Sequence, residues 1–139
     1  MSLEVSISLL ILRLGLALAF FAHSSQQLGW HGGRGFKGTI DNWKVVFGLP
    51  TPLGAIGILT EILASCALVA GILVRPAALG LVIFLAVAIW KAHWKHGYFL
   101  AQPGGKGMGI EFCLALLIIA LALVVGGSGD ISLERLLLG

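Results

Sequence analysis

The feature that most limits the fold of this chain is a set of four long apolar runs separated by more polar segments. Each run is rich in Leu, Ile and Ala, has roughly the 17–25 residues that a helix needs to cross a hydrocarbon core, and lacks the alternation of a strand. The sequence therefore predicts an all-α membrane protein, a single domain with four transmembrane helices, and excludes a membrane barrel. The expected helices cover about residues 7–28, 54–74, 76–93 and 109–125.

The composition favours a lipid environment over water. Hydrophobic residues make up 58% of the 139 residues and charged residues 11%, against about 25% charged residues in a typical soluble domain. A soluble chain of this size could not bury so much apolar surface. The net charge of +3 comes from basic residues scattered between apolar runs, which indicates lipid headgroups rather than nucleic acid as partner. We expect a multi-pass protein of the cell membrane.

The second and third runs meet at Arg75-Pro76. Unbroken, residues 54–93 would form a helix of about 60 Å, twice the thickness of the hydrocarbon core. Proline disfavours a helical residue before it and fits the first turn of a new helix. We therefore expect a hairpin turn here, which with four spans puts both termini on the same side. The first run contains Arg13, and no basic residue precedes the run. We therefore expect the first run to stay in the protein as a membrane anchor rather than to be cleaved as a signal peptide.

Two segments on the side opposite the termini are predicted to be functional loops, residues 29–53 and 94–108. Both mix Gly, aromatic and basic residues, and long loops in compact proteins often carry function. Within the first, residues 43–49 are expected to form a short interfacial helix. The basic residues of this loop are candidates to attract an anionic substrate to the mouth of a site, and they are Arg34, Lys37 and Lys44.

Three ionisable residues, His23, Glu61 and Glu111, lie inside the apolar runs near this same side. At a rise of 1.5 Å per residue they sit at similar depths, none more than about 10 Å below one face. Ionisable groups at membrane depth are costly and usually face the bundle interior. We therefore predict a polar pocket in which Glu61 and His23 exchange protons, assisted by Glu111. Further candidate contacts of a bound cofactor are Gln26, Gln27, His93, His96 and Tyr98.

Two other interpretations of these residues stay open. A hydrogen bond between Glu61 and His23 would by itself explain both residues as a lock between two helices. A His/Glu metal site has suitable ligand types, but the spacing is not that of a metal motif. The preferred hypothesis is a small-molecule site without a metal. The sequence carries no flavin, haem or iron–sulfur motif.

Several segments, taken in order, resemble the DoxX family of small four-helix membrane proteins. They are GILTEILASCALVAGILVRPAALGL (57–81), HGYFLAQPGGKGMGIEF (96–112) and GGSGDISLERLL (126–137), together with the first helix at 12–28. The chain departs from the family pattern at Glu134, where Asp is usual, and at HSSQQL (23–28), where the family often has a lysine.

The resemblance implies a redox-associated role without supplying a catalytic motif. Some DoxX-like proteins are membrane subunits of thiosulfate:quinone oxidoreductase. This implies a quinone as ligand, thiosulfate as the anion attracted to the site, and, if the chain is an enzyme, a membrane subunit of a quinone-linked oxidoreductase. The alternatives are a non-catalytic anchor for a soluble oxidoreductase subunit and a small transporter, which would need homo-oligomers.

Overall fold

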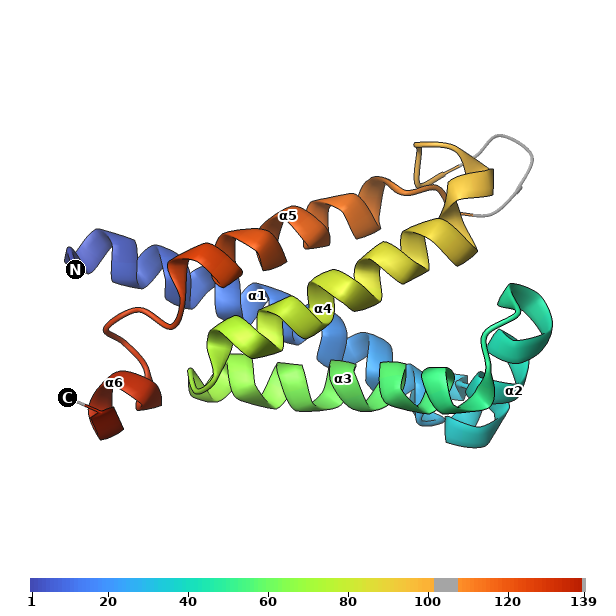
Figure 1. The fold of residues 1–139 in the computed structure, drawn as a ribbon, viewed down its shortest axis with the longest axis horizontal. Helices are drawn as coiled ribbons and strands as arrows, with labels where there is room; N and C mark the ends of the chain where they lie inside the picture. The colour runs from blue at the N-terminus through green and yellow to red at the C-terminus, as the bar shows by residue number, and fades with distance from the viewer. Residues whose placement is uncertain (102–107, 139) are drawn as a thin grey trace.

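The computed structural model describes residues 1–101 and 108–138, and the regular structure within them is helical throughout. The long helices of the described residues pack into one bundle (Figure 1). Helix α4 contacts α3 and α5, and α1 contacts α3 and α5, so the four close around one core. The start of α1 and the short helix α6 (Leu133–Leu138) lie at the same end of the molecule. The four helices are α1 (Leu3–Gln27), α3 (Thr51–Ala70), α4 (Val74–Ala88) and α5 (Glu111–Gly126).

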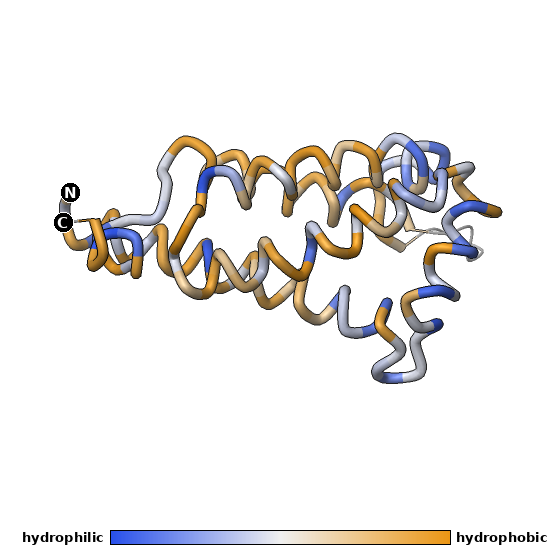
Figure 2. Tube along the Cα trace, turned by 60° about the horizontal axis from the view of Figure 1, so that its bottom comes forward, coloured by the Kyte–Doolittle hydropathy of each residue, from blue (hydrophilic) through white to orange (hydrophobic). Residues whose placement is uncertain are grey.

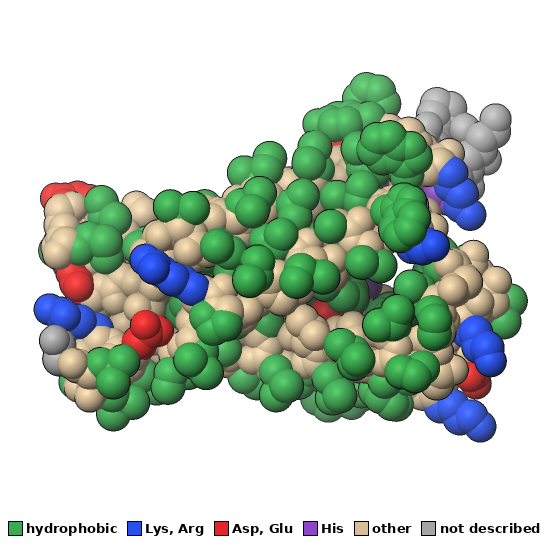
Figure 3. All heavy atoms as spheres, in the orientation of Figure 1, with side chains coloured by type: hydrophobic (Ala, Val, Ile, Leu, Met, Phe, Trp, Pro, Cys, Tyr) green, Lys and Arg blue, Asp and Glu red, His purple; other side chains and the backbone are tan. Residues whose placement is uncertain are grey.

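Among the described residues, three helical segments are long and apolar enough to cross a membrane, namely Leu3–Gln27, Thr51–Ala70 and Val74–His96. Helix α5 is also apolar but has 16 residues, about 24 Å of helix against a core of about 30 Å. Hydrophobic residues run along the long helices (Figure 2), every long helix exposes large apolar side chains, and Figure 3 shows many of them on one face of the bundle. Soluble proteins do not expose apolar surface on this scale, so the outside of the bundle is that of a membrane protein.

The core and the hairpin turn follow from apolar contact and backbone geometry. Fully buried side chains of all four helices form one apolar cluster. Gly71 ends α3 with a φ of 68°, a left-handed conformation that glycine adopts without strain. Pro76 lies in the first turn of α4, where its missing N–H leaves no hydrogen bond unmade. The predicted hairpin is present, but its turn lies at residues 71–73 rather than at Arg75-Pro76, which belong to the first turn of α4. The cluster includes Leu16, Leu68, Leu81 and Leu123.

Residues 29–53, expected to be a loop, are largely helical. The turn η1 (Trp30–Gly32) leads into α2 (Gly35–Phe47), and α3 already begins at Thr51. Helix α2 contacts α3 and α1 at the end of the bundle away from α6. The expected short helix at 43–49 is therefore the last part of a longer one. The clustered glycines hid this helix from sequence reasoning because glycine is a weak helix former.

The end of α4 continues into the second expected loop, residues 94–108. A π-helical turn, η2 (Ile89–His93), and a 3-10 turn, η3 (Trp94–His96), extend the helix. The chain then pairs with the start of α5, since the Glu111 N–H donates to the Tyr98 carbonyl at 2.9 Å. Residues 102–107 of this loop lie outside the described residues.

Candidate functional site

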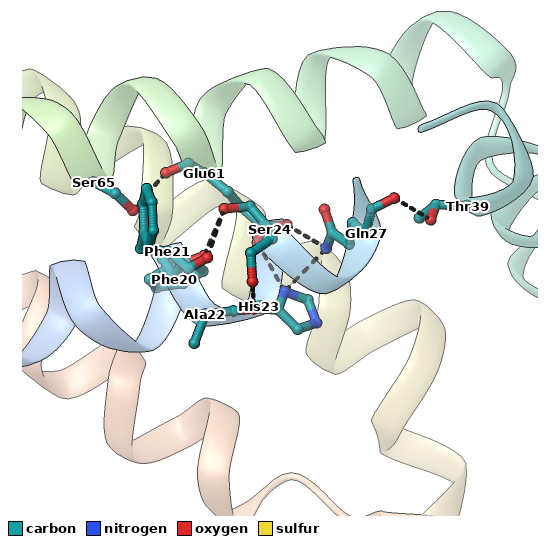
Figure 4. A network of polar contacts seen from close by, with 10 residues as sticks. Phe20, Phe21, Ala22, His23, Ser24, Gln27, Thr39, Glu61 and Ser65 are labelled. Atoms are coloured by element: carbon teal, nitrogen blue, oxygen red, sulfur yellow. Dashed lines mark hydrogen bonds and ion pairs between the residues drawn. The ribbon is translucent and has the colours of Figure 1, made fainter. Parts of the chain in front are cut away.

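A polar network joins α1 to α3 near the end of the bundle that α2 covers (Figure 4). Glu61 on α3 is fully buried. Its Oε2 lies 2.7 Å from His23 Nδ1, and its Oε1 accepts a hydrogen bond of 2.9 Å from Gln27 Nε2. Both carboxylate oxygens thus have a partner on α1, which offsets the cost of burying the acid between membrane helices.

Helical spacing brings these side chains together. His23 and Gln27 are four positions apart and therefore share one face of α1, and Gln27 Nε2 lies 3.0 Å from His23 Nδ1. Thr39 on α2 donates to the Gln27 backbone carbonyl at 3.0 Å. On α3, Ser65 Oγ donates to the Glu61 backbone carbonyl at 2.7 Å. The network therefore positions the His23 ring relative to three helices.

His23 differs from Glu61 in being open on one side. The His23 side chain is 54% exposed, whereas the Glu61 side chain is 0% exposed. Because Nδ1 contacts Glu61, the second ring nitrogen, Nε2, is left for a partner outside the network, and Figure 4 shows it pointing away from Glu61. A carboxylate that orients an imidazole and stabilises a proton on it is typical of histidines that transfer protons.

His23 lines a cavity of about 650 Å³ that α1, α2, α3, α4 and α5 enclose. Figure 3 shows a hollow on this face with histidine atoms inside it. Most lining side chains are aliphatic or aromatic, and a few are polar. Such a lining suits a mainly apolar small molecule with a polar group at a defined place. The aromatic side chains include Phe20, Trp43, Phe47, Phe84 and Phe112, and the polar ones His23, Thr60, Lys91, His93 and His96.

His93 is the second imidazole on this cavity whose orientation a hydrogen bond defines. It lies on the π-helical turn η2, a feature frequent at functional sites. Its Nδ1 lies 2.8 Å from the backbone carbonyl oxygen of Met108. A carbonyl oxygen only accepts, so Nδ1 carries a hydrogen and Nε2 is the ring atom left for a ligand. Nearby, the Lys91 ammonium lies 4.0 Å above the Trp90 ring.

Glu111, predicted to join His23 and Glu61, lies elsewhere. It is exposed, is not among the residues that line the cavity, and accepts a hydrogen bond of 2.9 Å from the Leu100 backbone N–H. Its carboxylate therefore holds the segment before α5 in place. Sequence position defines depth along a helix but not direction around it, and direction is what separates Glu111 from the other two residues.

Some of the other predicted site residues lie in the polar network or on the cavity, and the others lie away from both. Gln27 belongs to the network, and His93 and His96 line the cavity. Gln26 is exposed, and Tyr98 is exposed with its ring edge-on to Phe99 at 5.4 Å. Within the described ranges, no group of three or more His, Cys, Asp or Glu side chains is placed to hold a metal ion. The predicted anion-attracting residues are exposed and do not line the cavity; they are Arg34, Lys37 and Lys44.

Sequence reasoning missed the aromatic wall of the cavity. The Phe84 ring of α4 contacts the Phe20 ring of α1 edge-on, with 5.9 Å between the ring centroids. It also contacts the Trp43 ring of α2, with 6.2 Å between the centroids. Trp43 was expected at the membrane interface, and nothing marked Phe84 among the other apolar residues of its run. The pocket expected to be polar is therefore an apolar cavity, with Glu61 behind His23 rather than on the wall.

Comparisons with known proteins show the family of this chain. The family model DoxX matches residues 8–94, the part of the chain that holds both His23 and Glu61. A protein of Haemophilus influenzae, described as an uncharacterized protein, is 33% identical over 135 residues, which cover 94% of this chain and 83% of that relative. No solved structure matches the chain. Since the family model spans more than half of the sequence, the chain belongs to the DoxX family.

Proposed function

We propose that this DoxX-family membrane protein binds a small, quinone-like molecule in the cavity beside His23, and that His23 and Glu61 exchange a proton with it. The polar ring of the ligand lies against His23, and its apolar part lies against the aromatic and aliphatic wall. The observation that carries the proposal is a fully buried carboxylate whose imidazole partner opens onto an apolar cavity.

The exposure of His23 favours a binding role over a lock between helices. A hydrogen bond that only joined α1 to α3 would be strongest with both partners shielded from competing groups. Here the acid is shielded and the imidazole is 54% exposed. The ring nitrogen that faces away from Glu61 can therefore meet a ligand, and ionisable groups at membrane depth commonly mark such sites.

The size and lining of the cavity favour an amphipathic ligand. A volume of about 650 Å³ falls within the range of about 300–1,000 Å³ typical of small-molecule sites. A free anion such as thiosulfate would lose its hydration among these apolar walls, which is costly. We propose that Arg34, Lys37 and Lys44 contact anionic headgroups or an anionic substrate outside the cavity. Oxidation or reduction of the ligand would need a soluble oxidoreductase partner that exchanges electrons with it.

We also propose four membrane crossings, by α1, α3, α4 with its extension to His96, and α5, with both termini on one side. The apolar surface of α5 and its contacts with α1 and α4 support this arrangement. Exposed tryptophans lie beyond or near the helix ends opposite the termini, as expected at a membrane–water interface. They are Trp30, Trp90 and Trp94.

The test is binding of decylubiquinone and of its hydroquinone to the purified protein in lipid nanodiscs. Glu61→Gln keeps the shape of the side chain and removes the charge that stabilises a proton on His23. We expect binding of the hydroquinone to weaken about tenfold, because a charge-assisted hydrogen bond contributes on the order of 1.5 kcal/mol or more.

Glu111→Gln is the matched control, because it makes the same chemical change at an exposed carboxylate that does not line the cavity. We expect its affinities to equal those of the unsubstituted protein. The proposal is wrong if the unsubstituted protein binds neither probe, or if the two Glu→Gln variants bind both probes equally well.

A further inference from the structure

The two imidazoles with defined orientation on the cavity, His23 and His93, are not equivalent. We propose that their difference makes the site prefer the hydroquinone form of its ligand over the quinone form. This inference rests on the proposed function. It specifies which oxidation state of the ligand the residues of this chain favour.

His23 presents an N–H donor to the cavity. With a carboxylate and a neutral imidazole, the Glu61–His23 pair would carry a net negative charge, which is costly because Glu61 is fully buried between membrane helices. Gln27 adds a donor to Glu61 but no charge. One further proton neutralises the pair, whether as an ion pair or as a carboxylic acid beside a neutral imidazole. In both forms Nδ1 and Oε2 share one hydrogen, and Nε2 carries the other.

His93 presents an acceptor to the cavity. Its Nδ1 donates to the Met108 carbonyl at 2.8 Å, and in a neutral imidazole the other nitrogen then has no hydrogen. A carbonyl, unlike the carboxylate beside His23, carries no charge that would stabilise an imidazolium. His93 Nε2 is therefore a hydrogen-bond acceptor.

A donor and an acceptor on one cavity distinguish the two oxidation states of a quinone. Quinone carbonyl oxygens only accept, so they pair with His23 and leave His93 Nε2 without a partner. Hydroquinone hydroxyl groups accept and also donate, so they satisfy both rings. Sites built to hydrogen-bond a hydroxyl group discriminate against analogues that lack it, because a polar atom of the site then loses its partner when the ligand displaces water from it.

We expect the unsubstituted protein to bind decylubiquinol about tenfold more tightly than decylubiquinone. Tighter binding of the reduced form raises the reduction potential of the bound couple, by about 30 mV for a tenfold preference and two electrons. Redox-inert probes give the same comparison without oxidation during the titration. The monomethyl ether of the hydroquinone keeps one hydroxyl donor and should bind like decylubiquinol, whereas the dimethyl ether has none and should bind like the quinone.

His93→Phe should abolish the preference for decylubiquinol, because it removes both the acceptor that a hydroxyl group satisfies and the ring nitrogen that decylubiquinone leaves unpaired. His96→Phe is the matched control, since His96 also lines the cavity, and it should keep the preference. If His93→Phe does not fold, the ether series on the unsubstituted protein decides alone. Equal binding of both oxidation states, or tighter binding of the quinone, overturns this inference and leaves the proposed function standing. Binding of neither form overturns the proposed function itself.

Discussion

Helix α1 carries two buried polar sites of opposite character, one around Arg13 and one around His23. Arg13 is 1% exposed, and its guanidinium donates to the backbone carbonyls of Ser128 at 2.5 Å and Ile131 at 2.9 Å. These bonds hold the segment after α5 against the start of the bundle. His23 has one ring nitrogen in a network and the other toward a cavity. Arg13 therefore holds segments of the chain together, whereas His23 is available to a ligand.

The largest expected effect is on the Arg13 side of the comparison. Arg13→Met keeps the apolar stem and leaves two backbone carbonyls without donors, so the free energy of unfolding should fall by about 3 kcal/mol. Thermal unfolding in detergent measures this, with ligand affinity of the folded fraction unchanged. Arg135→Met is the control, because Arg135 is 61% exposed and its ion pair with Asp130 is 3.8 Å long. Equal destabilisation by both substitutions would contradict the comparison.

The next effect concerns Gly71, whose absent side chain makes room for Arg13. A Cβ at Gly71 would collide with the Arg13 guanidinium, and φ there is +68°. Gly71→Ala should therefore lower the free energy of unfolding by about 2 kcal/mol, part from the left-handed backbone and part from the collision. Gly48→Ala has a φ of +66° but open space around it, so it should show only the backbone part. In an Arg13→Met background, the cost of Gly71→Ala should shrink.

A third prediction concerns the cavity, where binding rather than stability should change. Ala88 lines the cavity, so Ala88→Phe fills part of it and should weaken hydroquinone binding at least about tenfold, because the ligand loses its space. Val125→Phe adds the same bulk at a residue that is 80% exposed and away from the cavity, and it should not change affinity. If both variants bind like the unsubstituted protein, this cavity is not the binding site.

The smallest effect depends on pH and concerns Asp130, at the end that holds the termini. A hydrogen bond from the Met1 amino group, together with Ser6 and Arg135, lowers the pKa of Asp130. A lowered pKa in the folded state gives a stabilisation that is present above the ordinary Asp pKa of about 3.9 and is lost as the pH falls through the lower folded value. Asp130→Asn should therefore be slightly less stable than the unsubstituted protein at pH 7.

Unfolding temperatures at pH 7 and at successively lower pH measure this difference, which should shrink on acidification. Asp41→Asn, at another exposed aspartate, is the control and should show no such trend. A difference that grows as the pH falls would mean that the Asp130 carboxylate does not stabilise the folded state.

Sequence reasoning located the long helices, because their positions depend on hydropathy. It did not predict the directions in which side chains point from those helices. The apolar runs matched α1, α3, α4 and α5 to within a few residues, because long hydrophobic stretches leave few alternatives. Depth counting placed His23 and Glu61 together because they lie at the same level of facing helices. It placed Glu111 there too, although that side chain faces the Leu100 backbone. The direction in which a side chain points around the helix axis depends on tertiary contacts, which a single sequence does not show.

The first part of helix α2, before the expected short helix at 43–49, was missed for a different reason. Gly35 and Gly38 lower the helix propensity of this segment, and its helical form depends on contacts with α3 and α1. The carbonyl of Gln27 accepts from Thr39 at 3.0 Å, so the missed helix also supports the polar network. The aromatic wall, to which α2 contributes Trp43, therefore could not be expected from local pattern alone.

The π-helical turn at Ile89–His93 has a consequence for how this end of α4 can vary. A π-helical turn holds one residue more than an α-helical turn, so removing one residue from it would restore a regular helix, and the residues after it would keep nearly the same direction around the axis. Trp94 and His96 would then point as they do now. A single-residue deletion within 89–93 should therefore be tolerated better than one in the regular part of α4, which would rotate every later side chain by about 100°.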